Sequence, residues 1–318
     1  MNNFKNFKSY FSNILRKDQN IKFTILLGSG FHKFYNGNTS VLNNWDILLK
    51  SISPNFKVSG NYLLDFEKII LEQVSDSNAQ KQEDLLLKRI VNVIKDAESF
   101  AIENEINNYP SFIFNPNYVS DVISLNFDCL AEKLCKLIFK AKLIKSGYVE
   151  IDKKFGKDAL IHQTTKYKIL EFPGGKTITF WYPHGSVIKS SGIILGARKY
   201  GQHISSIELL RKHSKAEERK NKKKDTWYDK LTHNPILIIG ASISSNEWDI
   251  WSAFVNRERN FFMNINNGYR KPIYQMRSNH HKKQYEDNTN QKWFEPLFDE
   301  NLEFNEQWGK LLELFKKK

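Results

Sequence analysis

Four short segments, far apart in the chain, carry residue types that suit the binding of a phosphorylated nucleotide. Residues 25–30 and 239–242 end apolar runs in glycine-bearing turns, residues 124–128 end another run in Asn-Phe-Asp, and residues 182–185 contain an isolated His-Gly. Each segment alone is a weak signal. Their order and separations favour a nucleotide held at the edge of a parallel sheet, with an Asn and a His facing its ribose.

The first turn, Gly28-Ser29-Gly30, follows an apolar run. Glycines let a backbone approach a phosphate closely, and the N–H groups that open the next helix favour an anion. The dinucleotide fingerprint is incomplete, because Lys33 stands where a third Gly or Ala belongs. A hydride-transferring dehydrogenase is therefore a poor fit. A turn of this type is also common without any ligand, and that alternative stays open.

Asn126 and Asp128 follow the apolar run that contains Ile123. Residues just beyond the carboxyl end of a parallel strand face the ligand crevice. An Asn amide can donate and accept hydrogen bonds at once, which suits the orientation of a water or a ribose hydroxyl. Asp128 could hold Asn126 or cap the helix that begins nearby, and capping is the favoured role. Asn126 could equally be a turn residue.

His184 lies between Pro183 and Gly185, directly after a predicted strand. An unperturbed imidazole titrates near neutral pH and can act as a general base. The other seven histidines show no comparable setting; His280 and His281, for instance, lie in a polar stretch. A lone His is more often structural or exposed, so His184 gains weight only from the other three segments.

The periodicity of apolar residues predicts an α/β fold with a doubly wound, mostly parallel, Rossmann-like sheet, because strands alternate with helices. Strands are expected at residues 21–27, 122–125, 177–182, 236–239 and 272–275. Helices are expected within 1–19, twice within 60–107, from Cys129 to about residue 141, and at the carboxyl terminus. We divide the chain into an amphipathic helix (1–20), one domain (21–290) and a terminal helix (291–318). The domain carries an all-α helical insertion (about 60–115) and a polar, basic insertion (about 186–226).

Composition narrows the class of protein. A chain of 318 residues that is 40% hydrophobic can bury a large core. The two cysteines, Cys129 and Cys135, make neither a disulfide framework nor a four-ligand zinc site, so we expect a reducing, cytoplasmic location. No run of about 18 apolar residues exists, so no membrane span or membrane association is expected, and no secretory signal precedes the first strand.

The net charge of +13 is unevenly distributed, because residues 211–224 hold eight Lys or Arg against two Glu, a net charge of +6. Such a run could bind nucleic-acid phosphates or an acidic protein surface. A solvated loop or helix face is the alternative. No aromatic residue interrupts the run, so it offers no base-stacking surface.

The ordered set GSG (28–30), LNFD (125–128), PHG (183–185) and GAS (240–242) resembles the sirtuin-type NAD-binding fold, and most closely the sirtuin-like NADase branch of bacterial antiphage defence. Trp45-Asp46 with Leu48-Leu49, and Asp65-Phe66-Glu67, are similar to features of that branch. The resemblance implies catalytic roles for Asn126 and His184. It implies NAD contacts at Gly28, Ser29, Gly30, Phe31, Asp128, Gly240 and Ser242, with the first three holding the pyrophosphate.

Two departures from protein-deacylating sirtuins bear on the reaction. Their zinc ribbon has two CxxC pairs, and this sequence has none. The Asp-Phe-Arg element after their first glycine loop is also missing. The resemblance therefore implies hydrolysis of NAD to nicotinamide and ADP-ribose, with no metal, rather than acyl transfer.

An NADase that is always active would empty its own cell, so we expect control by a separate sensor or regulatory protein or by homo-oligomerisation. The basic run and the two terminal helices are the expected contact surfaces. Two alternatives remain: an NAD-dependent deacylase that lacks zinc, and a non-catalytic sensor that binds NAD, ADP-ribose or nucleic acid.

Overall fold

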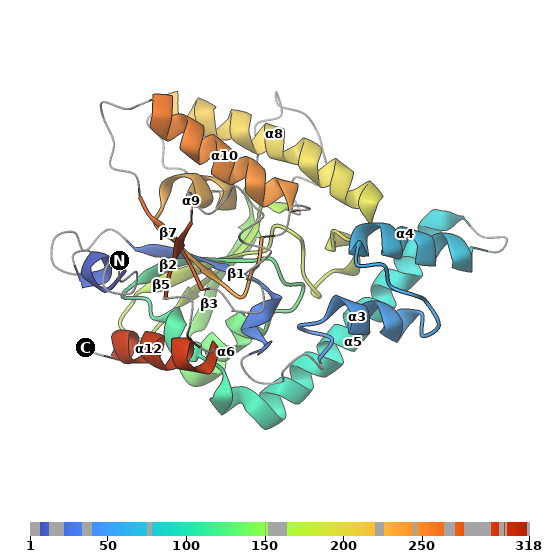
Figure 1. Ribbon diagram of the computed structural model, residues 1–318, viewed down its shortest axis with the longest axis horizontal. Helices are drawn as coiled ribbons and strands as arrows, with labels where there is room; N and C mark the ends of the chain where they lie inside the picture. Colours follow the sequence, from blue (N-terminus) through green and yellow to red (C-terminus); the bar gives the residue numbers. More distant parts are fainter. Residues whose placement is uncertain are drawn as a thin grey trace.

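Eight strands form one sheet in the computed structural model, which describes residues 7–12, 22–33, 40–74, 78–149, 151, 164–219, 226–243, 247–263, 271–276, 294–298, 302 and 304–316. The strand order is β3-β4-β5-β2-β1-β6-β7-β8 (Figure 1). The strands are β1 (Phe23–Leu27), β2 (Val119–Ser124), β3 (Lys142–Tyr148), β4 (Lys166–Glu171), β5 (Thr177–Trp181), β6 (Ile236–Ile239), β7 (Ile273–Gln275) and β8 (Glu295–Pro296). All neighbours are parallel except β3–β4 and β4–β5, so the expected mostly parallel α/β sheet is confirmed.

The strand order reverses at β1, which lies between β2 and β6. The chain leaves β1 for β2 and β5 on one side, then returns to β6 and β7 on the other side. At such a switch point the connections leave in opposite directions and open a crevice at the carboxyl ends of the strands. Strands β2, β1 and β6 end at the same position along the sheet, since Leu27, the last residue of β1, pairs with Ser124 and Ile239, the last residues of β2 and β6.

Helices cover both faces of the sheet (Figure 1). They are α3 (Trp45–Ile52), α4 (Tyr62–Gln73), α5 (Ala79–Glu105), α6 (Leu130–Ile138), α8 (Ala197–Arg219), α9 (Trp227–His233), α10 (Trp248–Met263) and α12 (Phe304–Lys316). Short 3-10 turns are η1 (Ser29–Phe31), η2 (Ile106–Asn108), η3 (Ser111–Phe114) and η5 (Ser190–Gly192). Helices α8, α9 and α10 lie over one face and α6 and α12 over the other, while α3, α4 and α5 form a lobe at one side.

Alternate residues of each central strand enter different cores, as the two-residue period of a strand requires. Ile25 and Leu27 join the core under α5, α6 and α12, whereas Leu26 joins the core under α8, α9 and α10. All five residues of β1 and all four of β6 are buried, because neighbouring strands and both helical layers surround them.

The two helices expected within the insertion are confirmed as α4 and α5. Asn61 and Asn78 cap them by accepting hydrogen bonds from Leu64 and Gln80. Ile90 and Ile94 of α5 are buried, as the helical spacing predicts. The helix expected from Cys129 to about residue 141 is shorter, because Lys140 takes a positive φ of 54° and β3 begins at Lys142.

The two terminal helices pack into the same core as the sheet, so they are not separate units. Residues 7–12 are helical, and Phe7 and Phe11 are buried. The ring of Phe11 lies 5.2 Å from that of Phe315 in α12, whose Trp308 is also buried. The sheet also continues beyond residue 290, through β8. The rest of the expected helix within 1–19 lies outside the described residues.

Several regions differ from the sequence prediction. The polar insertion expected over about 186–226 contains η5 and the 23-residue helix α8. Strands β3, β4 and β8 and helices α3, α9 and α10 were not expected, and β8 lies within the range given to the terminal helix. Strand β3 shows why: it is an edge strand with nearly every residue exposed, so its sequence has no apolar alternation to detect. Within the described residues, no helix has both the length and the apolar composition needed to cross a bilayer.

Candidate functional site

The four segments meet at the carboxyl edge of the sheet, as expected for a switch point. The amide of Leu125 donates to the carbonyl of Leu27 (2.9 Å), and the amide of Gly28 donates to that of Ile239 (2.9 Å). The amide of Val187 donates to the carbonyl of Phe127 (2.8 Å), which brings the loop after β5 to the same place. A cavity of about 630 Å³ opens there. Seven predicted residues line it: Gly28, Ser29, Asn126, Asp128, His184, Gly240 and Ser242.

The two glycine turns pack directly against each other. The amide of Gly30 donates to the carbonyl of Gly240 (2.7 Å), and a Cβ atom at Gly240 would lie 2.2 Å from the nitrogen of Phe31. Gly240 also has a φ of +67°, which side chains disfavour. The close approach of two loops therefore explains these glycines without a ligand.

Backbone amides of the first turn already have partners. Gly28 and Gly30 donate to the β6 loop, and Phe31 and His32 donate to the carbonyls of Gly28 and Ser29. The turn opens a short 3-10 helix, η1, and residues 34–39 lie outside the described part of the chain, so the helix expected to bind an anion stays a prediction. Phe31 is fully buried, with its ring 5.4 Å from that of Tyr109, and it does not line the cavity; neither does Gly30. Because these four amides already donate to protein carbonyls, they give little support to the expected binding of the pyrophosphate.

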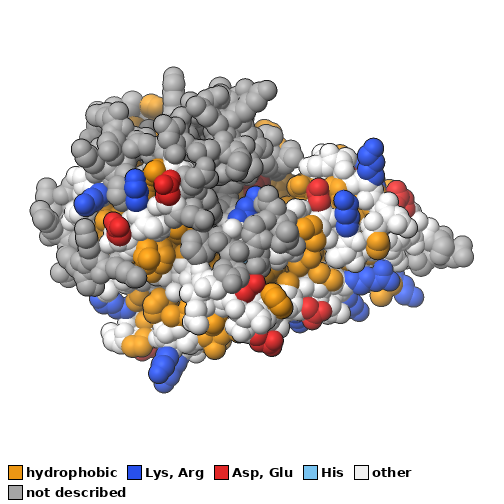
Figure 2. All heavy atoms as spheres, turned by 60° about the horizontal axis from the view of Figure 1, so that its bottom comes forward, with side chains coloured by type: hydrophobic (Ala, Val, Ile, Leu, Met, Phe, Trp, Pro, Cys, Tyr) orange, Lys and Arg blue, Asp and Glu red, His pale blue; other side chains and the backbone are white. Residues whose placement is uncertain are grey.

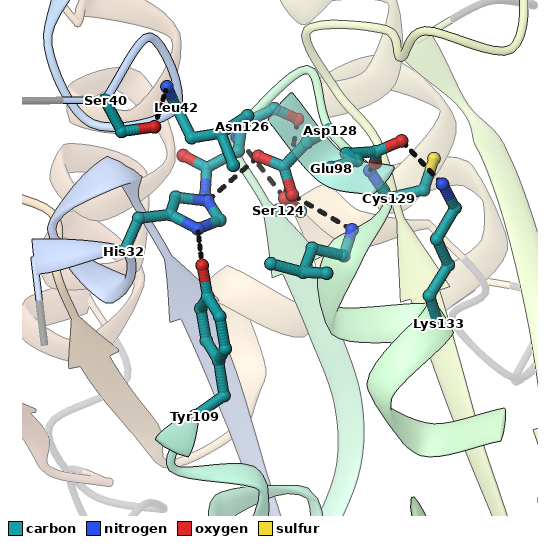
Figure 3. A network of polar contacts seen from close by, with 11 residues as sticks. His32, Ser40, Leu42, Glu98, Tyr109, Ser124, Asn126, Asp128, Cys129 and Lys133 are labelled. Atoms are coloured by element: carbon teal, nitrogen blue, oxygen red, sulfur yellow. Dashed lines mark hydrogen bonds and ion pairs between the residues drawn. The ribbon is translucent and has the colours of Figure 1, made fainter. Parts of the chain in front are cut away.

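Asn126 lies against a buried histidine that the sequence analysis did not select (Figure 3). Nε2 of His32 lies 3.0 Å from Oδ2 of Asp128 and 3.4 Å from Nδ2 of Asn126. Nδ1 of His32 lies 3.3 Å from the hydroxyl of Tyr109. A carboxylate only accepts, so Nε2–H donates to Asp128, while the Tyr109 hydroxyl can either donate to Nδ1 or accept from it. Protonated Nε2 has no lone pair left for the Asn126 amide, so Asn126 lies beside the pair of His32 and Asp128 at the cavity wall without being held by His32.

Asp128 has the favoured of the two roles that the sequence left open, a contact with the start of α6, and its second oxygen binds His32 rather than Asn126. Its Oδ1 accepts from the amide of Leu130 at the start of α6 (3.0 Å), and its Oδ2 holds His32. Burial alone would raise the pKa of Asp128, but the charge and hydrogen bond of His32 and the Leu130 amide lower it below the usual range. The carboxylate is therefore ionised at neutral pH.

His184 has a carboxylate partner far away in the sequence. Its Nε2 lies 2.7 Å from Oδ2 of Asp249, the second residue of α10. The same carboxylate binds two residues of α8: Nε2 of His203 lies 3.1 Å from Oδ2, and the hydroxyl of Tyr200 donates to Oδ1 (2.7 Å). The loop is fixed as well, because a Cβ atom at Gly185 would lie 1.8 Å from the carbonyl oxygen of Gly192.

These contacts favour a charged His184. Burial lowers its pKa, but the charge and hydrogen bond of Asp249 and the backbone of Leu125 raise it above 6.5. Both ring nitrogens thus face acceptors, which only the imidazolium satisfies together. Burial would raise the pKa of Asp249, yet His184 and His203 hold it well below 3.8. These contacts favour the imidazolium of His184 beside the carboxylate of Asp249.

His184, His203 and Asp249 also have the donor types of a transition-metal site, and their ligand atoms lie within 4.8 Å of one another. Hydrogen bonds already account for the contacts of Nε2 in both imidazoles with Asp249. The expectation of a metal-free site stays a prediction.

The sequence analysis missed His32, Tyr200, His203 and Asp249. Its statement that the other seven histidines lack a comparable setting is wrong for two of them, because His32 and His203 are almost fully buried and bonded to carboxylates. His32 stands two residues after Gly30, so its position in the first segment was the available signal. Asp249 carries no local motif, and only the fold brings it to His184.

No protein-family model matches this chain, and no curated protein matches it either. The class that the fold and cavity define is therefore an α/β protein with a crevice at the switch point of a mostly parallel sheet.

Proposed function

We propose that this protein is an NAD⁺ glycohydrolase of sirtuin-like type, which cleaves the bond between nicotinamide and ribose. The observation that carries the proposal is that Asn126 and His184 line one cavity together with residues of both glycine turns. His184 is held by the buried carboxylate of Asp249, and Asn126 lies beside the buried pair of His32 and Asp128. A side chain held as His184 is held is pre-organised for catalysis.

The bond to be broken already carries a cationic leaving group, so the transition state resembles an oxocarbenium ion. It needs positioning and charge stabilisation more than covalent catalysis. Asn126 holds the nicotinamide ribose and the attacking water, and Asp128 supplies a nearby negative charge. His184 accepts a proton from the water or a ribose hydroxyl once it has itself released one, so the reaction is favoured above its raised pKa.

The proposal is tested by incubating the purified protein, alone and with candidate regulatory partners, and following NAD loss and nicotinamide release by mass spectrometry. Asn126→Ala and His184→Ala should each lower turnover about a hundredfold or more, as loss of a positioned catalytic group does. Asn104→Ala, at an exposed position of α5, is the matched control and should leave turnover unchanged. Unchanged turnover in both site variants would refute the assignment.

Other outcomes of these assays would favour the alternative functions, a deacylase or a non-catalytic sensor. Deacylation of an acyl-lysine peptide with formation of O-acyl-ADP-ribose would identify a deacylase. Binding of NAD or ADP-ribose without turnover would identify a sensor, and nucleic-acid affinity that falls steeply with salt would point to the basic run.

We further propose that the enzyme is an NAD-depleting effector of antiphage defence in the cytoplasm, controlled by a partner protein or by oligomerisation. Both cysteines are free and buried, which fits a reducing compartment. The apolar faces of the terminal helices are buried in the core, so the basic part of α8 is the better contact surface of those expected. Figure 2 shows a further face, viewed from the side of α5 and α12, on which hydrophobic side chains reach the surface between charged ones.

Size-exclusion chromatography with light scattering tests this control. The protein alone should be an inactive or weakly active species, and activity should appear together with a larger assembly. A monomer with full, constitutive NADase activity would contradict the proposal.

A further inference from the structure

The cavity has two unlike walls. The sheet side is polar and glycine-rich, with Gly28, Asn126, His184 and Gly240. The opposite side comes from the helical lobe of α3, α4 and α5, and it carries aromatic and aliphatic side chains: Trp45, Leu48, Tyr62 and Ile94. Figure 1 shows this lobe beside the carboxyl end of β1, apart from the helices that cover the sheet. The proposed mechanism of NAD cleavage uses no residue of this second wall.

Three rings form a continuous surface on this second wall. Trp45 and Tyr62 are stacked, with ring centroids 5.6 Å apart and an interplanar angle of 19°. Phe127 meets Trp45 edge-on, with centroids 5.5 Å apart and an angle of 89°. All three line the cavity, and Trp45 and Tyr62 are only half-buried, so part of each faces the open volume.

Helix capping holds two of these rings rigidly. Trp45 is the first residue of α3, whose cap Asn44 accepts hydrogen bonds from the amides of Asp46 and Ile47. Tyr62 is the first residue of α4, whose cap Asn61 accepts from the amide of Leu64. Both rings pack against the core but stay partly exposed, whereas Phe66 and Leu49 nearby are fully buried. Rigid aromatic rings at a cavity wall bind planar rings by stacking at low entropic cost.

We propose that Trp45, Tyr62 and Phe127 form a stacking subsite for one planar heteroaromatic ring of the substrate. The proposal rests on the proposed function for the identity of that substrate, a dinucleotide with an adenine and a nicotinamide ring. The polar wall then binds ribose and phosphates, and the lobe binds a ring. Phe127 follows Asn126 directly, so the aromatic wall adjoins the proposed site of bond cleavage.

The test measures binding apart from catalysis. AMP and nicotinamide are titrated separately, up to millimolar concentration, into the full-length protein by calorimetry, so that the two arms identify the ring. At least one probe should bind, with a Kd about tenfold higher in Trp45→Ala, since stacking on an aromatic residue contributes about that much. Trp45→Phe keeps a ring and should change the Kd less than about threefold. Trp248→Ala, an exposed tryptophan outside the cavity, should leave the Kd unchanged.

Tyr62→Leu provides a second variant should Trp45→Ala fail to fold, and it should raise the same Kd. Absence of binding by both probes, or an unchanged Kd in the folded ring-deleting variants, would overturn the subsite. The two proposals fail separately. Probe binding that depends on Trp45 without any NAD cleavage would refute the NADase and keep the subsite. NAD cleavage with an unchanged KM in Trp45→Ala would refute the subsite and keep the NADase.

Discussion

Asp249 holds His184 through a hydrogen bond of 2.7 Å, and at the residue scale this contact sets the pH at which His184 can accept a proton. The adjacent carboxylate stabilises the imidazolium, so the pKa of His184 lies above its usual value of 6.5. A base must be neutral to act. The rate of NAD hydrolysis should therefore fall as the pH drops through this raised pKa.

Replacement of Asp249 by Asn should move the acidic limb of the pH–rate profile to lower pH. The charge that raises the pKa of His184 is lost, so the lowering of that pKa by burial meets less opposition. The maximal rate should also fall, because the amide holds the ring less firmly. NMR titration of the His184 ring should show the same direction of shift. Asp96→Asn makes the same chemical change on an exposed face of α5 and should leave the profile in place.

At the scale of elements, the interlocked turns after β1 and β6 decide whether the cavity wall forms. Gly240→Ala should lower the free energy of unfolding by about 1–3 kcal/mol, because the residue has a positive φ and its Cβ would meet the backbone of Phe31 and Gly30. Gly201→Ala, in the middle of α8 with no atom within 4 Å of the added Cβ, should instead stabilise the fold by about 0.5–1 kcal/mol. Urea denaturation measures both. Equal midpoints for the two variants would contradict the interlock.

The elements that the sequence predicted well are those whose environment is uniform along their length. Strands β1 and β6 are buried on both faces, so an apolar run is a sufficient signal for each. Helix α5 has one buried and one exposed face, and its apolar residues keep the helical period. Strand β3 is exposed and α8 is largely polar, so neither has a pattern that distinguishes it from a loop.

Much of the candidate site was also accessible from the sequence, because each of the four segments directly follows a strand. The partners were not. His184 and Asp249 are 65 positions apart, and His32 and Asp128 are 96 apart. The first pair depends on where the fold places α10, and the second on the pairing of β1 with β2; local periodicity specifies neither. Gly28 and Gly240 line the cavity as predicted and Gly30 does not, and the closest contacts of these glycines are between the two turns.

At the scale of the whole molecule, the amino-terminal end of α8 connects the helical lobe to His184. Arg198 and Lys199 bind Glu83 of α5, with N···O distances of 2.5 and 3.2 Å, and both Glu83 and Lys199 are buried. The next residue, Tyr200, donates to the carboxylate of Asp249. The lobe that supplies the aromatic wall and the residues that hold His184 therefore meet within three consecutive positions of one helix.

Removal of Glu83 should affect both stability and catalysis. Glu83→Ala leaves Lys199 buried beside no carboxylate, and such a loss costs roughly 3 kcal/mol of folding free energy. Tyr200 should also be held less firmly, so NAD turnover should fall and the KM should rise, since both walls of the cavity depend on this junction. The matched control is Glu208→Ala, which removes an exposed carboxylate from its pair with Arg211 on the same helix and should cost under about 1 kcal/mol. If thermal denaturation and NAD turnover of Glu83→Ala match those of Glu208→Ala, then α8 does not couple the lobe to His184, and the two walls of the cavity are positioned independently.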